Sequence, residues 1–309
     1  MTGKRIVVTE FIDTDALGEL AGFDVVYRPD LADDRAALTG LVADADAIIV
    51  RNRTQVDAAL VGAAPRLVAV GRLGVGLDNI DLAACKARGI AVFPALGANT
   101  VSVAEYVIAT AMSLLRGAYG ANAAMIAGQW PRAALSEGGE VAGRTMGLLG
   151  LGTIGRAVAD RAAALGMTIA AYDPHLPADD PIWRTAERVD LAGLLATADV
   201  LSLHVPLTEG TRGLIDARAI AAMKESAILI NTARGGIVDE AALAEALKAG
   251  KLGGAALDVF AIEPLTAAAA AVFEGAPNLI LTPHIAGLTG ESNVRVSSVT
   301  VANVKRALS

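Results

Sequence analysis

The chain has 309 residues, which is enough for two domains of ordinary size that each bury a core. Its residues are 54% hydrophobic and only 4% aromatic, so we expect cores of Ala, Val, Leu and Ile, as in helices packed on parallel strands. A formal net charge of −7 argues against nucleic-acid and anionic-membrane partners, because both need a basic face.

Cys85 is the only cysteine, which excludes an internal disulfide and any cysteine-based zinc site, and no metal site is expected. The first apolar run, residues 6–8, is soon followed by Glu10 and Asp13 and is too short for a signal peptide or a membrane span. We therefore expect a cytoplasmic protein.

Short apolar runs alternate with helix-like segments over the first hundred residues. The runs predict buried parallel strands, and the segments between them carry acidic residues or Thr near their starts, as helices do. The expected strands are 6–9, 24–27, 47–50, 67–70 and 91–93, and the expected helices are 14–20, 34–41, 57–63 and 81–88. This pattern predicts an α/β domain with five strands.

The longest apolar stretch, residues 101–115, contains the charged Glu105, which favours a helix crossing between domains over a membrane span. Beyond the loop-like residues 128–132 and 137–140 the alternation resumes. We expect strands at 146–149, 168–172, 200–204, 227–230, 255–258 and 279–282, helix N-caps at Asp190, Asp216 and Asp239, and helices at 267–271 and 293–308. Six strands separated by helices are typical of a dinucleotide-binding sheet.

The glycine-rich sequence 150–155, Gly-Leu-Gly-Thr-Ile-Gly, joins the first of these six strands to a helix expected at 156–165. In such a turn the first glycine permits a tight bend, the second lets a pyrophosphate approach the backbone, and the third lets the helix pack on the strand. The phosphates would bind at the helix N-terminus, where free N–H groups and the helix dipole favour an anion. The motif predicts a dinucleotide site.

Asp173 ends the next strand, eighteen residues past Gly155. A carboxylate at this place can accept hydrogen bonds from the adenosine ribose. We expect NAD and not NADP as the cofactor, because a 2′-phosphate would meet a negative charge.

Polar residues follow three consecutive strands of this second half, and ligands of open parallel sheets bind beyond these strand ends. Arg234, Glu263 and His284 are the candidates, and they suit hydride transfer to a 2-keto acid. His284 can donate a proton to the carbonyl oxygen. Glu263 can keep that imidazole protonated, and Arg234 can bind the substrate carboxylate with a planar, bidentate cation.

Each of these residues also has a purely structural interpretation. Arg234 could be a surface arginine, and Glu263 could be an exposed turn residue. His204, at a strand end where the backbone would pass the cofactor, is an alternative proton donor, although no carboxylate and arginine follow it in the same way. His175 is expected in a loop on the adenosine side.

The first half offers a candidate anion site. The closely spaced glycines of residues 71–78 could hold a carboxylate on backbone N–H groups or form an ordinary turn. Arg51, Arg53 and Arg72 lie at strand ends, where they could face a second anionic group or simply solvent.

Over essentially its whole length the chain resembles the D-isomer-specific 2-hydroxyacid dehydrogenases. The matching segments are 71–81, 99–106, 150–155 with Asp173, 204–208, 231–236, 258–264 and 283–287. The resemblance implies a Rossmann-type doubly wound parallel sheet for the cofactor, residues 98–287, and a smaller flavodoxin-like α/β substrate domain, residues 1–97 with 288–309. It also implies a homodimer that pairs through the cofactor domain.

The resemblance further implies roles for individual residues, with Arg234, Glu263 and His284 as the catalytic residues. NAD is expected to contact Gly150, Gly152, Thr153, Ile154, Gly155, Asp173, His204, Val205, Pro206, Thr232, Ala233 and Asp258, the last three at the nicotinamide amide. The substrate is expected to contact Arg53, Arg72, Leu73, Gly74, Val75, Gly76 and Arg234, with its carboxylate on the N–H groups of Val75 and Gly76.

The expected substrate is a small D-configured 2-hydroxy acid or its 2-keto acid. Segments 51–54, 71–74 and 291–295 are most similar to a sulfolactate dehydrogenase-like branch of the family. A second anionic group, as in sulfolactate or 3-phosphoglycerate, would need an extra cation such as Arg53 or Arg72. The alternatives are a glyoxylate/hydroxypyruvate reductase, a D-lactate-type dehydrogenase and, in a different class, a non-catalytic NAD-sensing interaction protein.

Overall fold

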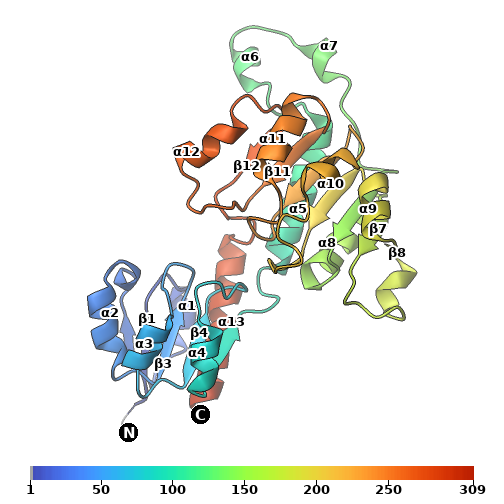
Figure 1. Cartoon of the computed structure of the whole chain (residues 1–309). Helices are drawn as coiled ribbons and strands as arrows, with labels where there is room; N and C mark the ends of the chain where they lie inside the picture. Colours follow the sequence, from blue (N-terminus) through green and yellow to red (C-terminus); the bar gives the residue numbers. More distant parts are fainter. Residues whose placement is uncertain (1–2) are drawn as a thin grey trace. The chain divides into compact units, whose positions relative to one another are not determined.

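The computed structural model describes residues 3–309, which form two compact units (Figure 1). The smaller unit takes the chain up to Asn99 together with Leu288–Ser309, and the larger unit is Thr100–Gly287. No helix in the described part of the chain is both long enough and apolar enough to cross a membrane.

The smaller unit is a five-stranded parallel sheet in the order β2-β1-β3-β4-β5, the flavodoxin-like order. Its elements are β1 Arg5–Val8, α1 Thr14–Gly18, β2 Asp24–Tyr27, η1 Leu31–Asp33, α2 Arg35–Val42, β3 Ala47–Val50, α3 Ala58–Ala63, β4 Ala69–Arg72, α4 Leu82–Ala87, β5 Ala91–Pro94 and α13 Gly290–Leu308. One apolar core lies on each face of the sheet.

The C-terminal helix α13 covers one of these faces through Val296, Val301 and Val304. Gly71 permits the close approach, because a Cβ there would lie 2.7 Å from Cγ2 of Val304 and 2.8 Å from Cγ2 of Thr300. The last residues of the sequence are therefore part of the core of the smaller unit.

The larger unit is a seven-stranded parallel sheet in the order β12-β11-β10-β9-β6-β7-β8. Its elements are α5 Thr100–Arg116, α6 Asn122–Ile126, α7 Arg132–Leu135, β6 Thr145–Leu149, α8 Thr153–Ala164, β7 Thr168–Tyr172, η2 Pro181–Arg184, β8 Glu187–Arg188, α9 Leu191–Thr197, β9 Val200–Leu203, α10 Ala217–Ala221, β10 Ile228–Asn231, α11 Glu240–Lys248, β11 Gly254–Leu257, α12 Ala267–Ala270, η3 Ala271–Phe273 and β12 Leu279–Leu281. Helices α5 and α8 pack on one face and α9, α10 and α11 on the other. The predicted fold class, a doubly wound parallel sheet with a second, smaller α/β domain, is confirmed.

Local signals explain where several helices begin. The predicted N-caps are confirmed, because the carboxylates of Asp190, Asp216 and Asp239 accept hydrogen bonds from backbone N–H groups in the first turns of α9, α10 and α11.

The larger sheet has one strand more than the six expected. Strand β8 is only two residues long, both exposed, and pairs with β7 at the edge of the sheet. A short charged edge strand carries no apolar pattern, so the sequence gives no sign of it.

Candidate active site

The glycine turn after β6 leaves almost no room at two positions and open space at a third. Gly150 has a φ of +93°, and a Cβ there would lie 2.8 Å from the carbonyl oxygen of His204. A Cβ on Gly155 would lie 2.4 Å from the carbonyl oxygen of Gly150, whereas one on Gly152 would meet nothing within 4 Å. The turn is therefore tight against the protein and open where a phosphate would approach.

Helix α8 begins directly after Gly152, and no side chain of the described residues caps its first N–H groups. These groups and the helix dipole favour an anion. The turn and the helix start therefore fit a dinucleotide pyrophosphate.

Asp173 follows β7 and lies against this turn. Its carboxylate accepts hydrogen bonds from the N–H groups of Leu151, at 2.9 Å, and His175, at 3.0 Å. These bonds fix the carboxylate beside the first glycine, while the side chain is only partly buried. The predicted contact with the adenosine ribose stays a prediction, and His175 is exposed in the following loop.

His204 directly follows β9 and is partly buried, and its desolvation lowers the pKa of the imidazole to about 4. Its Nε2 lies 3.0 Å from Oγ of Ser202. Because burial disfavours the charged form, the ring is neutral near pH 7 and is a poor proton donor. This removes the main reason for considering His204 as the alternative acid.

The loop after β10 is held by the side chain of Asn231. Its Oδ1 accepts a hydrogen bond from the N–H of Ala233, at 3.0 Å, and its Nδ2 donates to the carbonyl oxygen of Arg234, at 2.9 Å. Oγ1 of Thr232 is buried and has no hydrogen-bond partner among residues 3–309. A buried hydroxyl in this state is costly, so it can serve a ligand in this part of the site.

The loop that carries Glu263 passes directly over the Arg234 loop. A Cβ on Gly235 would lie 1.7 Å from the carbonyl oxygen of Phe260, so only glycine fits under this crossing. The N–H of Ala261 donates to Oε1 of Glu240 at 2.6 Å, which ties the Glu263 loop to the start of α11.

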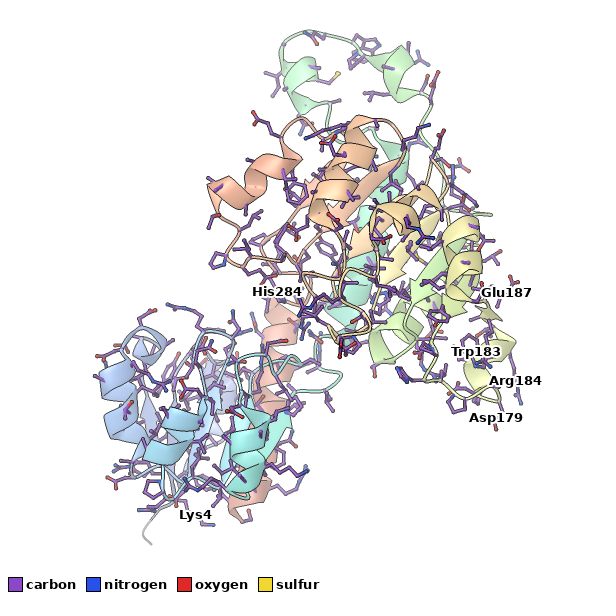
Figure 2. The ribbon with its side chains drawn as sticks, in the orientation of Figure 1. Lys4, Asp179, Trp183, Arg184, Glu187 and His284 are labelled. Atoms are coloured by element: carbon purple, nitrogen blue, oxygen red, sulfur yellow. The ribbon has the colours of Figure 1, made fainter. Side chains whose placement is uncertain are left out.

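Glu263 and His284 lie in direct contact. Oε2 of Glu263 is 2.7 Å from Nδ1 of His284, and Oε1 accepts a hydrogen bond from the N–H of Phe260 at 2.9 Å. The side chain of His284 is 52% exposed, so its second ring nitrogen is open to a ligand. Figure 2 shows His284 among the loops of the larger unit, well away from Trp183 and Glu187 at the β8 edge.

Asp258 is buried, with 1% of its surface exposed. Its carboxylate accepts hydrogen bonds from the hydroxyl of Thr282 and the N–H groups of Ile285 and Ala286. The predicted contact of Asp258 with the nicotinamide amide stays a prediction.

In the smaller unit the turn after β4 carries several of the predicted substrate contacts. Arg72 folds back over Gly74, because its Nη1 donates to the carbonyl oxygen of Leu73 at 2.9 Å. The side chain of Leu73 is 1% exposed and packs in the core under α13. Val75 and Gly76 are partly buried.

Arg53 lies in the neighbouring loop 51–54 and forms an exposed ion pair with Asp33. This loop is fixed by Glu10, which is 4% exposed. Its carboxylate accepts the N–H groups of Arg51 at 2.8 Å, Thr54 at 3.0 Å and Arg53 at 3.1 Å. The contacts predicted between substrate and Arg53 or residues 72–76 stay predictions.

The sequence alone does not identify four residues whose side chains hold the loops of these candidate sites: Glu10, Tyr106, Glu240 and Thr282. Glu10 and Thr282 stand at or just beyond the carboxyl ends of β1 and β12, so the strand-end argument could have found them. Tyr106 and Glu240 lie on helices, and only the tertiary structure brings them to these loops.

Known proteins resemble this chain over its full length. Residues 108–286 match the family described as D-isomer specific 2-hydroxyacid dehydrogenase, NAD binding domain. An (S)-sulfolactate dehydrogenase of Chromohalobacter salexigens is 55% identical over 305 residues, covering 98% of each chain. A hydroxypyruvate reductase of Thermotoga maritima is 38% identical over 309 residues, covering 100% of this chain and 99% of the other.

A solved structure has the same fold. The crystal structure of a glyoxylate reductase from Paecilomyes thermophila superposes with a TM-score of 0.87 and 30% identity, covering 100% of this chain and 96% of that one.

The burial of His204 predicts a loss of stability in mild acid. Its pKa of about 4 in the folded chain is below the ordinary value near 6.5, so between these pH values the unfolded chain binds more protons. The stability contributed by the neutral ring is complete above pH 6.5 and falls as the pH drops towards 4, by up to roughly 3 kcal/mol.

Urea unfolding at pH 7, 6 and 5 measures this effect by comparing the wild type with His204→Asn. We expect the free energy of unfolding of the wild type to fall more steeply with acid than that of the variant. Parallel pH dependences would contradict a buried, neutral imidazole.

Proposed function

The chain belongs to the family of D-isomer specific 2-hydroxyacid dehydrogenases, and from this premise we propose that Arg234, Glu263 and His284 catalyse the interconversion of a D-2-hydroxy acid and its 2-keto acid. The protein is an NAD-dependent oxidoreductase. The observation that carries the assignment is the 2.7 Å contact between Nδ1 of His284 and Oε2 of Glu263 at the ends of adjacent parallel strands.

His284 is the proton donor in the direction of reduction. When bound, NADH supplies the hydride that adds to C2 of the keto acid. Nδ1 of His284 is engaged by Glu263, so Nε2 gives the proton to the carbonyl oxygen, which becomes the hydroxyl group. In the oxidising direction the same nitrogen takes the proton back.

Arg234 binds the reacting end of the substrate. A guanidinium can hold a carboxylate with two parallel hydrogen bonds and draw charge from the adjacent carbonyl. The hydrogen bonds of Asn231 fix the backbone of the Arg234 loop, so the side chain starts from a defined place. Thr232, Ala233 and Asp258 remain the proposed contacts of the nicotinamide amide.

Substitution of the proposed catalytic residues separates chemistry from cofactor binding. We expect His284→Gln and Arg234→Gln each to lower kcat/KM by at least about 100-fold, because proton transfer and charge stabilisation are lost. NADH binding, followed by its fluorescence, should persist, and His175→Gln should keep wild-type turnover.

Asp173→Ala is the complementary variant. It should keep turnover while raising the rate with NADPH relative to NADH, because the charge facing a 2′-phosphate is gone. Near wild-type kcat/KM in both His284→Gln and Arg234→Gln would overturn the assignment, and a wild type that is faster with NADPH would overturn the role of Asp173.

We also propose that the substrate carries a second anionic group, with a C3 sulfonate as the first candidate. The relative at 55% identity is named for (S)-sulfolactate. The S label agrees with the D configuration, because sulfur gives the CH2SO3 group priority over the carboxylate and so exchanges the labels that lactate would carry.

The loop of residues 51–54 supports this proposal. Glu10 already accepts the N–H groups of Arg51, Arg53 and Thr54, so these three are not available to a distal anion, and we assign its binding to a side chain of the loop. Arg53 is 55% exposed, and its surface ion pair with Asp33 can be exchanged for a ligand at little cost. In a chain of net charge −7, such local cations have to supply the attraction.

A panel of 2-keto acids tests this proposal through kcat/KM with NADH. Sulfopyruvate, phosphohydroxypyruvate and oxaloacetate should be preferred over pyruvate, glyoxylate and hydroxypyruvate. Arg53→Gln should lower kcat/KM roughly 10- to 100-fold for the acids with a second anionic group, since a charged hydrogen bond is lost, and should leave the monoanionic acids almost unchanged.

Arg28→Gln is the matched control, because Arg28 also forms an exposed pair, with Asp30. A preference for pyruvate would contradict the second anionic group. A preference for glyoxylate or hydroxypyruvate would favour the alternative reductase activity.

We further propose that two copies of the larger unit form a homodimer. Large apolar side chains are exposed on the segment that carries α6 and α7, which projects from the body of its unit in Figure 1. The most exposed are Ile126 at 88%, Trp130 at 74% and Tyr119 at 68%.

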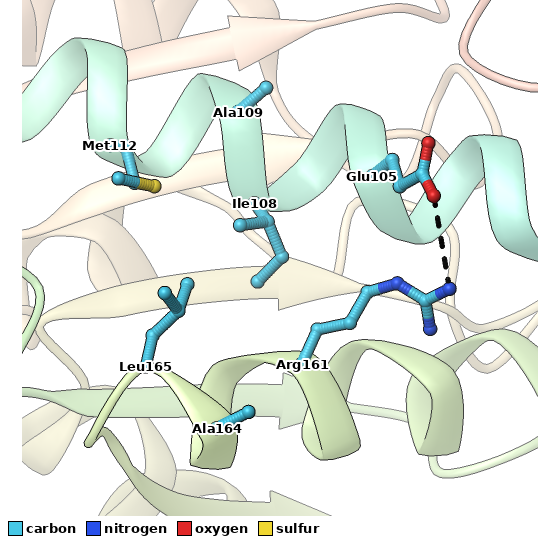
Figure 3. Close-up of a pocket in the computed structure, with 7 residues that line it drawn as sticks. All are labelled: Glu105, Ile108, Ala109, Met112, Arg161, Ala164 and Leu165. Carbon is cyan, nitrogen blue, oxygen red and sulfur yellow. Dashed lines mark ion pairs between the residues drawn. The ribbon is translucent and has the colours of Figure 1, made fainter.

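The larger unit also has an apolar groove of about 420 Å³ between α5 and α8 (Figure 3). The Glu105–Arg161 ion pair lies at its edge, and the apolar residues that line it are Ile108, Ala109, Met112, Ala164 and Leu165. Such apolar surface is typical of an interface.

Light scattering after size exclusion measures the oligomeric state. The double variant Ile126→Asp/Trp130→Asp should shift a dimer to a monomer, because two buried contacts become charged. Leu82→Asp, a similar change at the exposed start of α4 in the other unit, should leave the dimer intact. A monomeric wild type would refute the proposal.

A cytoplasmic location stays a prediction from the sequence.

A further inference from the structure

His284 has an unusual backbone conformation. Its φ of +56° lies in the left-handed region, which costs free energy for a side chain with a Cβ and persists only where the surroundings impose it. Asp258 supplies this constraint. Its backbone carbonyl accepts the N–H of His284 at 2.8 Å, and its carboxylate accepts those of Ile285 and Ala286, each at 2.8 Å.

Three successive N–H groups around the histidine are thus held by one residue. The direction in which the imidazole leaves the backbone depends on where the Asp258 carboxylate lies. That carboxylate has no ion pair among the described residues, so hydrogen bonds alone keep it in place.

A chain of two hydroxyl groups reaches the same carboxylate from helix α5. Oγ1 of Thr282 donates to Oδ1 of Asp258 at 2.6 Å, and the hydroxyl of Tyr106 lies 2.6 Å from Oγ1 of Thr282. The Thr282 hydroxyl has a single proton, which is used on Asp258, so Tyr106 must be the donor to Thr282. The hydrogen bonds therefore run in one direction, from Tyr106 through Thr282 to Asp258.

We propose that Tyr106 and Thr282 are positioning residues for the reaction: they orient the Asp258 carboxylate, which in turn fixes the His284 loop so that the imidazole meets Glu263 and the substrate. This proposal rests on the proposed role of His284 as proton donor. Neither residue touches the reacting atoms in it.

Two properties of the network support a role in alignment. Thr282 directly precedes the Pro283-His284 pair, so any shift of its side chain acts on the same short segment. Burial raises the pKa of Tyr106, so the phenol keeps its proton and remains a donor at every pH at which such an enzyme would work.

Steady-state kinetics and NADH binding of the intact protein test the proposal. Thr282→Val keeps the shape of the side chain and removes the hydroxyl, whereas Thr282→Ser keeps the hydroxyl. We expect Thr282→Val to lower kcat about 10- to 100-fold, as a misplaced catalytic group does, with KM and the NADH Kd within about twofold of wild type. Thr282→Ser should recover most of kcat.

Tyr106→Phe is a second variant that conserves the ring and keeps the test open if Thr282→Val folds poorly. It should lower kcat by roughly 3- to 10-fold. In the double variant Tyr106→Phe/Thr282→Val, the fold decrease in kcat should be smaller than the product of the two single decreases, because both residues act through the same hydrogen-bond chain. The solvent deuterium isotope effect on kcat should rise in both variants as proton transfer becomes slower. Tyr27→Phe, in the smaller unit, is the control and should match wild type.

The outcomes separate this inference from the proposed function. If His284→Gln abolishes turnover while Thr282→Val and Tyr106→Phe retain kcat within about twofold, the positioning role is wrong and the role of His284 stands. The inference also fails if Thr282→Ser is as slow as Thr282→Val, or if the losses appear in KM and NADH affinity instead of kcat. If His284→Gln keeps its turnover, the proposed function itself is wrong.

Discussion

The parallel pairing of β10, β11 and β12 is the constraint on which the candidate site depends. Their carboxyl ends lie at one edge of the sheet, so the loops carrying Arg234, Glu263 and His284 are neighbours, although they are far apart in sequence. The pairing of β6 with β9 brings the glycine turn against His204 in the same way. At both places backbone crosses backbone so closely that a Cβ on Gly150 or Gly235 would collide with a carbonyl oxygen. The strand order determines which loops are neighbours, and these glycines permit their close approach.

Buried carboxylates fix the loops that the strand order brings together. Glu10 in the smaller unit and Asp258 in the larger unit both accept hydrogen bonds chiefly from backbone N–H groups. A buried carboxylate without such donors would be strongly destabilising, so each loop and its anchor stabilise one another. Neutral N–H groups therefore satisfy most of the hydrogen-bonding capacity of these two carboxylates.

The sequence predicts the parts of this structure that depend on local pattern. Strands β2, β3 and β7 coincide with the expected residues, because each is an apolar run bounded by polar residues or turns. Helix α8 begins at Thr153, three residues before the expected start, since a sequence argument counts Gly155 against a helix. Helices α6 and α7, five and four residues long, are not expected from the sequence: they lie beside residues 128–132 and 137–140, which are loop-like in sequence. The strand-end argument selects Arg234, Glu263 and His284 as candidates, and their catalytic role stays a prediction. That argument cannot find tertiary contacts: Tyr106 and Thr282 are 176 residues apart, so no local pattern joins them.

The proposed reactive side chains are more exposed than the side chains that support their loops, so the proposed site can be open to a substrate and still have a defined geometry. The side chains of His284 and Glu263 are 52% and 35% exposed, and a side chain in that state has little packing of its own to hold it. Asp258 and Asn231 are each 1% exposed, and each forms hydrogen bonds with the backbone that carries a proposed catalytic residue. The position of the imidazole is therefore fixed by hydrogen bonds from buried side chains to the loop backbone, and not by side chains packed around the ring. In the proposed site, a substrate could then reach the exposed His284 and Glu263 side chains, while the buried Asp258 and Asn231 keep the backbone beneath them in place.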